Sequence, residues 1–296
     1  MLHFEQWMYV TPVPILGIIL FGSMVLAGFV GNYLRKRKIA RDGEETDQGN
    51  TQEGYVVSAV LGLLALLLGF TFSLAVDRFD SRRILVLEES NAIGTAYLRS
   101  QLLDEPHRTR MSTILHDYTE NRVKLGQATV GEGQRQLLAI NDKLLNDLWS
   151  ATAASFDSVR HLDFSTPLIE SVNAVIDDDS ARKAARFARV PVGVFLVLFI
   201  YVLTSAALLG YVLGSGRKRI GTTVFLALLA TSMLLIIDID GPSTGLIRES
   251  QLPMVLLRDN LRSMPPGSYD KWRMGVAQSQ KLESRALPAS VPSPSP

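Results

Sequence analysis

The sequence predicts an all-α integral membrane protein, with four transmembrane helices and a helical domain inserted between the second and third. Of its 296 residues, 47% are hydrophobic and only 20% are charged, a composition more apolar than that of an average soluble domain. The apolar residues gather in four blocks, each long enough to cross a bilayer core of about 30 Å. The segment between the second and third blocks lacks alternating valine-rich runs and has few glycines, so it is expected to be helical as well.

Four uncharged stretches define the spans, because a helix needs roughly 20 apolar residues to satisfy its backbone within hydrocarbon. They are residues 10–34, 55–76, 190–213 and 220–237, and we extend the fourth span to residue 239. The first stretch has no basic segment before it and a basic tetrad after it, so we interpret it as a span rather than a secretory signal. The remaining segments are the amino terminus within 1–34, a basic loop (35–54), the helical domain (77–189), a second basic loop (214–219) and the carboxyl-terminal segment (240–296).

The two short loops predict how the chain is oriented in the membrane. Their basic residues are Arg35, Lys36, Arg37, Lys38 and Arg41 in the first loop, and Arg217, Lys218 and Arg219 in the second. Short loops rich in lysine and arginine stay in the cytoplasm, whereas long segments cross the membrane largely regardless of their charge. Both loops are therefore expected to be cytoplasmic and the 77–189 domain extracytoplasmic, although seven further basic residues flank the spans on that side.

The 77–189 domain is predicted to consist of successive helices. Residues 77–103 contain no proline and one glycine, so they should continue the second span as one long helix. Asp104 is expected to cap the next helix. A helix over 134–156 is expected to bury Leu137, Leu138, Ile140, Leu144, Leu145 and Leu148. Ser165 begins a short helix, and residues 177–180 are expected to cap the helix that feeds the third span, an interpretation we favour over a divalent-cation site. The end of the chain, rich in serine and proline, is predicted to be disordered.

Composition and motifs argue against several classes of function. The net charge is +1 and no basic run exceeds four residues, so nucleic acid is not an expected partner. The chain has no cysteine and four scattered histidines, so we expect no metal ion and no other cofactor. We do not expect an enzyme, because no catalytic triad, phosphate-binding loop or zinc-protease motif is evident. The spans also lack the charged residues usual in proton-coupled transporters.

One face of the second span carries only small residues, at spacings of three or four: Ser58, Gly62, Ala65, Gly69 and Ser73. Small residues let two helices approach closely within lipid, so helix packing is the simpler interpretation. Ala206, Gly210 and Gly214 in the third span share this spacing and favour it. The alternative is a narrow pore in which hydroxyl groups and backbone dipoles face ions.

A charged cluster follows the second span and consists of Asp77, Arg78, Asp80, Arg82 and Arg83. Asp80 and Arg83 can pair on a helix, and the other arginines can reach lipid headgroups, which would explain the cluster without a functional role. If the helix lines a vestibule in an oligomer, a ring of these arginines would instead concentrate anions at its mouth. Glu88, Glu89 and Asn91 lie farther along, where they would contact a neighbouring subunit or solvent.

Two segments carry a resemblance to a known family. The first, residues 66–98, reads LLLGFTFSLAVDRFDSRRILVLEESNAIGTAYL, and the second, residues 237–247, reads IDIDGPSTGLI. They resemble the bestrophin-like family of bacterial membrane proteins, long described as a domain of unknown function, over about residues 10–260. The second segment matches the family's Asp-rich stretch after the last span, at Asp238, Asp240, Pro242 and Gly245. The resemblance implies a multi-pass protein of the bacterial inner membrane.

A remoter similarity is to the bestrophin anion channels themselves, whose second span also ends in an aromatic, acidic and arginine-containing cluster. Those channels are pentamers whose second span lines the pore, so the similarity implies a homo-oligomer in the lipid bilayer with inorganic anions as partners. Their large helical region is cytoplasmic, which is opposite to the orientation that the basic loops indicate here.

The leading hypothesis is therefore an oligomeric, bestrophin-like anion channel with the second span facing the symmetry axis. The alternative is a non-conducting membrane scaffold or signalling protein whose helical domain binds a partner. A channel requires a symmetric ring with a continuous axial pathway, whereas a scaffold can be a monomer or a dimer.

Overall fold

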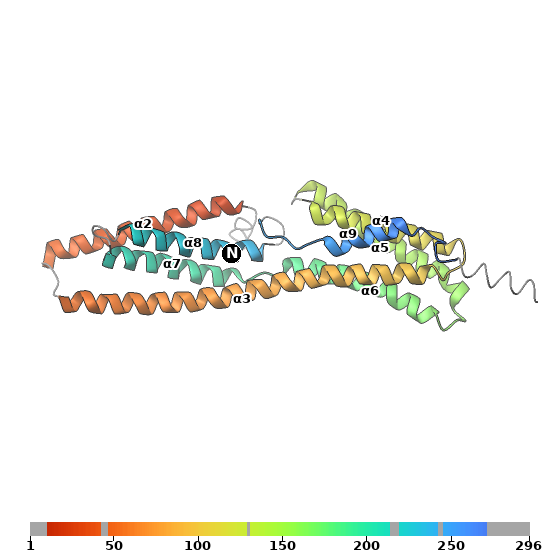
Figure 1. Cartoon of the computed structure of the whole chain (residues 1–296), viewed down its shortest axis with the longest axis horizontal. Coiled ribbons are helices and arrows are strands. Elements are labelled where there is room, and N and C mark those ends of the chain that lie inside the picture. Colours follow the sequence, from red (N-terminus) through yellow and green to blue (C-terminus); the bar gives the residue numbers. More distant parts are fainter. Residues whose placement is uncertain (1–10, 43–46, 129–130, 214–218, 242–244, 271–296) are drawn as a thin grey trace, which may run out of the picture. The chain divides into compact units, whose positions relative to one another are not determined.

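The computed structural model describes residues 11–42, 47–128, 131–213, 219–241 and 245–270 (Figure 1). This part of the chain contains helices and no strand, which confirms the predicted all-α architecture. The helices are α2 (Val13–Asp42), α3 (Asp47–Ser100), α4 (His107–Gln127), α5 (Glu132–Val159), α6 (Ser165–Phe187), α7 (Val192–Leu213), α8 (Arg219–Asp240) and α9 (Leu252–Ser263).

The chain divides into two compact units. The membrane unit comprises Met1–Val86, Thr129–Gly131 and Ser180–Ser250, and the helical unit comprises Leu87–Ala128, Glu132–Asp179 and Gln251–Pro296. Among the described residues, four helical stretches are long and apolar enough to cross a membrane: Val13–Arg41, Gln52–Ser100, Ser165–Leu213 and Ile220–Asp240. The four predicted spans are thus confirmed, and the second continues beyond residue 76 without interruption, as expected.

The first basic loop is shorter than predicted, because α2 continues to Asp42 and α3 already begins at Asp47. Arg35 lies within the part of α2 that was predicted to be loop. Its Nη1 donates to the carbonyl oxygens of Val212, at 2.7 Å, and Tyr211, at 3.3 Å. These carbonyls belong to the last turn of α7, which has no helical partners for them, so the guanidinium group caps that helix. Of the second basic loop, residues 214–218 lie outside the described part of the chain.

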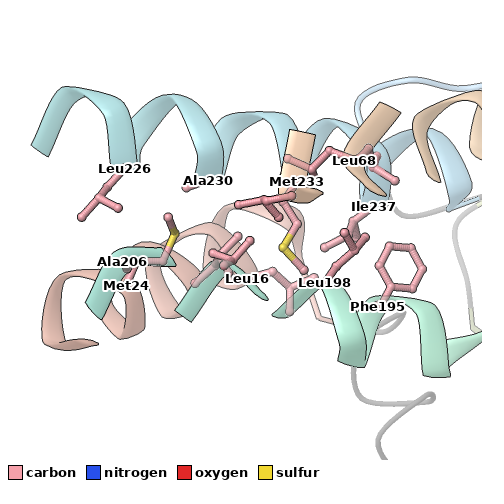
Figure 2. Close-up of a cluster of buried hydrophobic side chains, with 14 of the residues drawn as sticks. Leu16, Met24, Leu68, Phe195, Leu198, Ala206, Leu226, Ala230, Met233 and Ile237 are labelled. Carbon is pink, nitrogen blue, oxygen red and sulfur yellow. The ribbon is translucent and has the colours of Figure 1, made fainter. Parts of the chain in front are cut away.

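The core of the membrane unit is built from apolar side chains of α2, α3, α7 and α8, including Leu16, Leu68, Leu198 and Met233 (Figure 2). Glycines set the approach of α2 to α7. A Cβ atom on Gly31 would overlap the carbonyl of Ala207, and one on Gly210 would overlap the backbone of Gly28. Close helix packing through small residues was predicted for the third span, and Gly210 makes such a contact. Its partner on α2, Gly28, was not anticipated.

The helical unit has its own core, formed by the second half of α3 with α4, α5, α6 and α9. Its fully buried side chains include Ile93, Leu115, Leu148, Leu168 and Met254. The helix predicted over 134–156 is α5, and two of its six expected core residues, Leu145 and Leu148, are buried. Leu137, Leu138 and Leu144 are half-buried, and Ile140 is 47% exposed because the neighbouring Asn141 takes the inward position.

Three details of the helical unit differ from the prediction. Pro106 rather than Asp104 precedes α4, and a carboxylate oxygen of Glu105 accepts from the backbone N–H of Thr109 at 3.2 Å. Residues 177–180 lie inside α6 rather than at a helix start, because Asp179 is drawn into a buried ion pair described below. Helix α9 was not expected, and it buries Met254 and Leu261 against the core. Disorder was predicted from about Ser263 onward, but residues 263–270 are described and held by contacts, since Arg108 donates to Asp270 at 2.6 Å. Residues 271–296 lie outside the described part of the chain.

Candidate functional site

The small-residue face of the second span is exposed along its whole length. Ser58, Gly62, Ala65, Gly69 and Ser73 are all exposed on α3, and a Cβ atom on either glycine would meet no atom within 4 Å. The opposite side of the helix is buried in the membrane unit through Val57, Leu64, Leu68, Thr71 and Ala75. This face is therefore not packed against any described part of the same chain, which removes packing within the chain as its explanation.

Large apolar side chains occupy the other exposed positions of the same span. Leu63, Leu66, Phe70 and Phe72 point outward from α3, as Ile18 does from α2 and Leu228 from α8. Such side chains suit hydrocarbon, whereas glycine and serine leave backbone and hydroxyl groups near the surface. A hydroxyl group in hydrocarbon needs a hydrogen-bond acceptor, and the hydroxyl of Ser58 finds one in its own helix, where it donates to the carbonyl of Gly54 at 3.0 Å.

The charged cluster after the second span is divided between two environments. Arg82 is buried, and its Nη2 and Nη1 donate to the carbonyl oxygens of Ile239, at 2.8 Å, and Asp240, at 3.4 Å. Its Nε also donates to the carboxylate of Glu249. Arg82 is thus a cap for the end of α8, and its assignment to an open vestibule was wrong, because residue 82 faces the interior of the membrane unit.

The other members of the cluster are nearer to the surface. Arg83 and Asp80 form the predicted pair, with 3.8 Å between Nε and the carboxylate. Asp77 is exposed, and Arg78 is half-buried, with a buried Nε that has no hydrogen-bond partner among the described residues. Arg78 and Arg83 are therefore the arginines of this cluster that are not buried.

The two aspartates of the Asp-rich stretch lie in the last turn of α8, and both carboxylates accept from backbone N–H groups. The carboxylate of Asp238 accepts from the backbone N–H groups of Leu246, at 2.8 Å, and Ile247, at 3.0 Å. A Cβ atom on Gly245 would overlap that carboxylate, which explains the glycine. Asp240 is fully buried and accepts from the backbone N–H of Val190 at 3.0 Å, in the break between α6 and α7. Pro242 lies outside the described residues.

The two segments that carry the family resemblance therefore meet at one place. Arg82 from the first segment binds the carbonyl groups of Ile239 and Asp240 from the second. The acidic residues and Gly245 shape the backbone there, so these motif positions have a structural role at the end of α8.

A buried polar network in the helical unit was missed by the sequence analysis. Glu89 of α3, Tyr118 and Arg122 of α4, Asn141 of α5 and Asp179 of α6 are all buried. Arg122 places Nε and Nη2 each 2.8 Å from a carboxylate oxygen of Glu89, and Nη1 3.2 Å from Asp179. Tyr118 donates to Glu89 at 2.5 Å, and Asn141 donates to Asp179 at 2.8 Å. The network therefore joins four helices through one arginine.

Electrostatics in this network follow from its burial. Burial raises the pKa of Tyr118 well above its ordinary value, and the nearby carboxylate of Glu89 adds to the rise. Burial alone would lower the pKa of Arg122, but Glu89, Tyr118 and Asp179 outweigh it and hold that pKa above its ordinary value. Arg122 thus stays charged between two carboxylates. The sequence held one signal for this network. Tyr118 and Arg122 are four residues apart, on the side of α4 that also carries Leu115, so both polar side chains share the buried face of that helix.

Comparison with known proteins gives a consistent result. The Bestrophin-like domain matches residues 22–254. A solved bacterial bestrophin homologue from Klebsiella pneumoniae shares 16% identity, with a TM-score of 0.60, over 83% of this chain and 97% of its own. A variant of that protein shares 17% identity with a TM-score of 0.59 over the same shares, and a second variant shares 16% with 0.58, over 86% and 96%. No curated protein matches the chain. At this level of identity the structures establish the fold, and the domain match establishes the family: the chain belongs to the bestrophin-like family of membrane proteins.

Proposed function

We propose that the protein is an oligomeric channel that conducts inorganic anions, with the small-residue face of α3 directed toward the symmetry axis. The observation that supports this most directly is the exposure of Ser58, Gly62, Ala65, Gly69 and Ser73 on a helix whose other side is buried. Membership of the bestrophin-like family adds to the proposal.

Lipid is a poor occupant for this face. Neighbouring exposed positions of α3 carry leucine and phenylalanine, which fill the space beside acyl chains, whereas the small-residue face leaves backbone and hydroxyl groups accessible. If copies of α3 surround a symmetry axis, these backbone and hydroxyl groups lie close to a passing ion and line a path narrow enough to select ions. The absence of side chains at Gly62 and Gly69 also lets copies of α3 approach one another closely.

The charge at the end of the span suits an anion. Arg82 is committed to the end of α8, so we assign attraction of anions to Arg78 and Arg83, whose side chains are not buried. A ring of such arginines, one from each copy, would raise the local concentration of anions at the mouth of the pore. Asp77 lies next to Arg78 and would moderate this effect.

We further propose that the 77–189 domain is extracytoplasmic and that both basic connectors are cytoplasmic, in the inner membrane of a bacterium. Because the chain has no cysteine, single-cysteine labelling with a membrane-impermeant maleimide on intact spheroplasts tests the orientation. Lys143→Cys in α5 is expected to react from outside, and Arg37→Cys in α2 only after the membrane is opened. The reverse pattern would place the domain in the cytoplasm and refute this orientation.

Anion flux from proteoliposomes, measured together with the mass of the purified protein in detergent, tests the channel. Ser73→Trp places an indole on the small-residue face and is expected to abolish flux without changing the oligomeric mass. Leu228→Trp, at an exposed apolar position of α8, is the matched control and is expected to conduct. A monomer, or a folded oligomer that carries no anion under varied pH, voltage and calcium, would refute the channel and favour the non-conducting scaffold.

A further inference from the structure

A groove lies in the membrane unit where α2, α7 and α8 pack together (Figure 1). Gly28 of α2 and Gly210 of α7 both line it, and their backbones touch, since a Cβ atom on Gly210 would overlap Gly28. Because neither glycine carries a side chain, space remains beside their contact. The groove is open to the surface of the unit, since two of its lining residues, Phe29 and Thr223, are exposed.

The lining of this groove changes from apolar to polar toward the basic connectors. The apolar residues farther from the connectors are Val25, Phe29 and Leu226. The polar residues nearer to them are Asn32, Thr222 and Thr223, and Leu213 completes the lining at that end. One end of the groove therefore suits a hydrocarbon chain, and the other offers amide and hydroxyl groups to a polar molecule.

The polar end lies at the depth of lipid headgroups. Tyr33, next to Asn32, is 63% exposed, and tyrosine is enriched at the boundary between membrane and water. Four basic residues, 35–38, follow directly. Val25 lies seven residues earlier on α2, which places it about 10 Å deeper at the usual helical rise. The groove thus runs from the headgroup region into the acyl-chain region.

A positive charge lies beyond the polar end. Lys36 is exposed and follows Asn32 by four residues and Phe29 by seven, so the three share one side of α2. An ammonium group attracts phosphate, and an amide donates to ester or phosphate oxygens. Apolar, hydrogen-bonding and cationic groups follow one another in the order of the acyl chain, ester and phosphate of a phospholipid.

We propose that the groove binds one phospholipid from the leaflet on the side of the basic connectors. An acyl chain lies along the apolar lining, and the phosphate group lies near Asn32 and Lys36. The surroundings favour lipid over a protein partner, because Leu26 of α2 and Val224 of α8, beside the groove, are 64% and 54% exposed and suit hydrocarbon. A free anion would leave the apolar part of the groove unused.

Native mass spectrometry of the full-length protein in detergent, with phosphatidylglycerol added, tests this site. The wild-type protein is expected to retain one phosphatidylglycerol per chain. Lys36→Gln should weaken this binding about fivefold, the usual effect of one cation at the membrane surface. Arg37→Gln is the matched control, because it removes the same charge at the next exposed residue, on another side of α2, and it should bind as the wild type does.

A second variant tests the groove itself. Thr223→Trp, at an exposed position of α8, places an indole in the groove and should abolish retention of the lipid without changing the oligomeric mass or the Tm in lipid-free detergent. Glycerol 3-phosphate, which has no acyl chain, should not displace phosphatidylglycerol from the wild-type protein.

Several results would overturn the inference. Equal weakening by Lys36→Gln and Arg37→Gln would reduce the effect to bulk charge, and undiminished binding by folded Thr223→Trp would place the lipid elsewhere. Displacement by glycerol 3-phosphate would indicate a site for free anions, and a changed oligomeric mass of Thr223→Trp would indicate that a second copy covers the groove. Lipid retention is measured without ion flux, so its failure leaves the channel proposal unaffected.

Discussion

Arg122 offers a sharp test of how the helical unit is held together. Replacing it by methionine keeps much of the side-chain volume but removes the cation between Glu89 and Asp179. These two carboxylates are 0% and 1% exposed, and Arg122 is their shared ionic partner among the contacts described above. Removing one member of a buried ion pair typically costs about 3–5 kcal/mol, because the remaining charge stays desolvated.

A loss of that size is measurable by thermal unfolding in detergent. At roughly 2–4 °C for each kcal/mol, Arg122→Met should lower the Tm by about 10 °C. Intrinsic tryptophan fluorescence provides the readout, since Trp149 lies on α5 of the same unit. As a control, Arg135→Met removes an exposed arginine of α5 that pairs only across one helical turn, and it should change the Tm by less than about 2 °C.

A double variant distinguishes a lost interaction from a general defect. Glu89→Gln combined with Arg122→Met leaves one buried charge fewer than Arg122→Met alone, so it should recover part of the lost stability. The reasoning would be refuted by an Arg122→Met protein whose Tm matches that of the Arg135→Met control. It would also be refuted if the double variant were less stable than Arg122→Met.

Three further predictions concern single contacts. Gly31→Ala should destabilise the protein by more than about 2 kcal/mol in thermal unfolding, because the new Cβ overlaps the carbonyl of Ala207. Asp238→Ala removes a carboxylate that accepts two backbone N–H groups, and it should cost about 2–4 kcal/mol and speed proteolysis after residue 240. Hydrogen bonds from the side chains of Arg108 and Thr109 lower the pKa of Glu105, so its contribution to stability is present above the unfolded pKa and is lost as pH falls through the folded pKa. Glu105→Gln should therefore lower the Tm at pH 7 and leave it unchanged at strongly acidic pH.

Each of these has its own contrary outcome. Gly22→Ala, on the same helix, serves as the control for Gly31→Ala, since its Cβ meets no atom within 4 Å, and equal losses of stability in the two variants would contradict the packing argument. Asp238→Asn retains one acceptor oxygen and should be less damaging than Asp238→Ala, so the opposite order would be unexpected. A Tm difference for Glu105→Gln that grows on acidification would have the wrong sign.

The spans were predictable because their signal is local. An uncharged apolar run of about 20 residues identifies a span wherever its neighbours lie. The long continuation of the second span followed from the absence of proline between residues 77 and 103. The capping of α7 by Arg35 was not predictable in this way, because its partner lies 177 positions away and no window of sequence contains both.

The candidate site shows the same limit. The small residues of α3 were identified by their spacing, but only the fold shows that nothing in the described chain covers them. Residues 177–180 have the composition of a helix start, yet α6 passes straight through them, because Asn141 and Arg122 provide Asp179 with partners that a cap would otherwise supply. Arg82 was assigned to a vestibule for a similar reason, since its partners come from the end of the last span.

The position of Arg82 has a consequence for how the protein is made. Its carbonyl partner Ile239 follows 157 residues later in the chain. At about 5–20 residues per second, the ribosome takes about 8–30 s to supply that partner, and during this time the guanidinium must remain hydrated at the membrane surface. Insertion of α8 therefore completes the membrane unit, because a chain that stops before residue 239 leaves the guanidinium of Arg82 without these carbonyl partners.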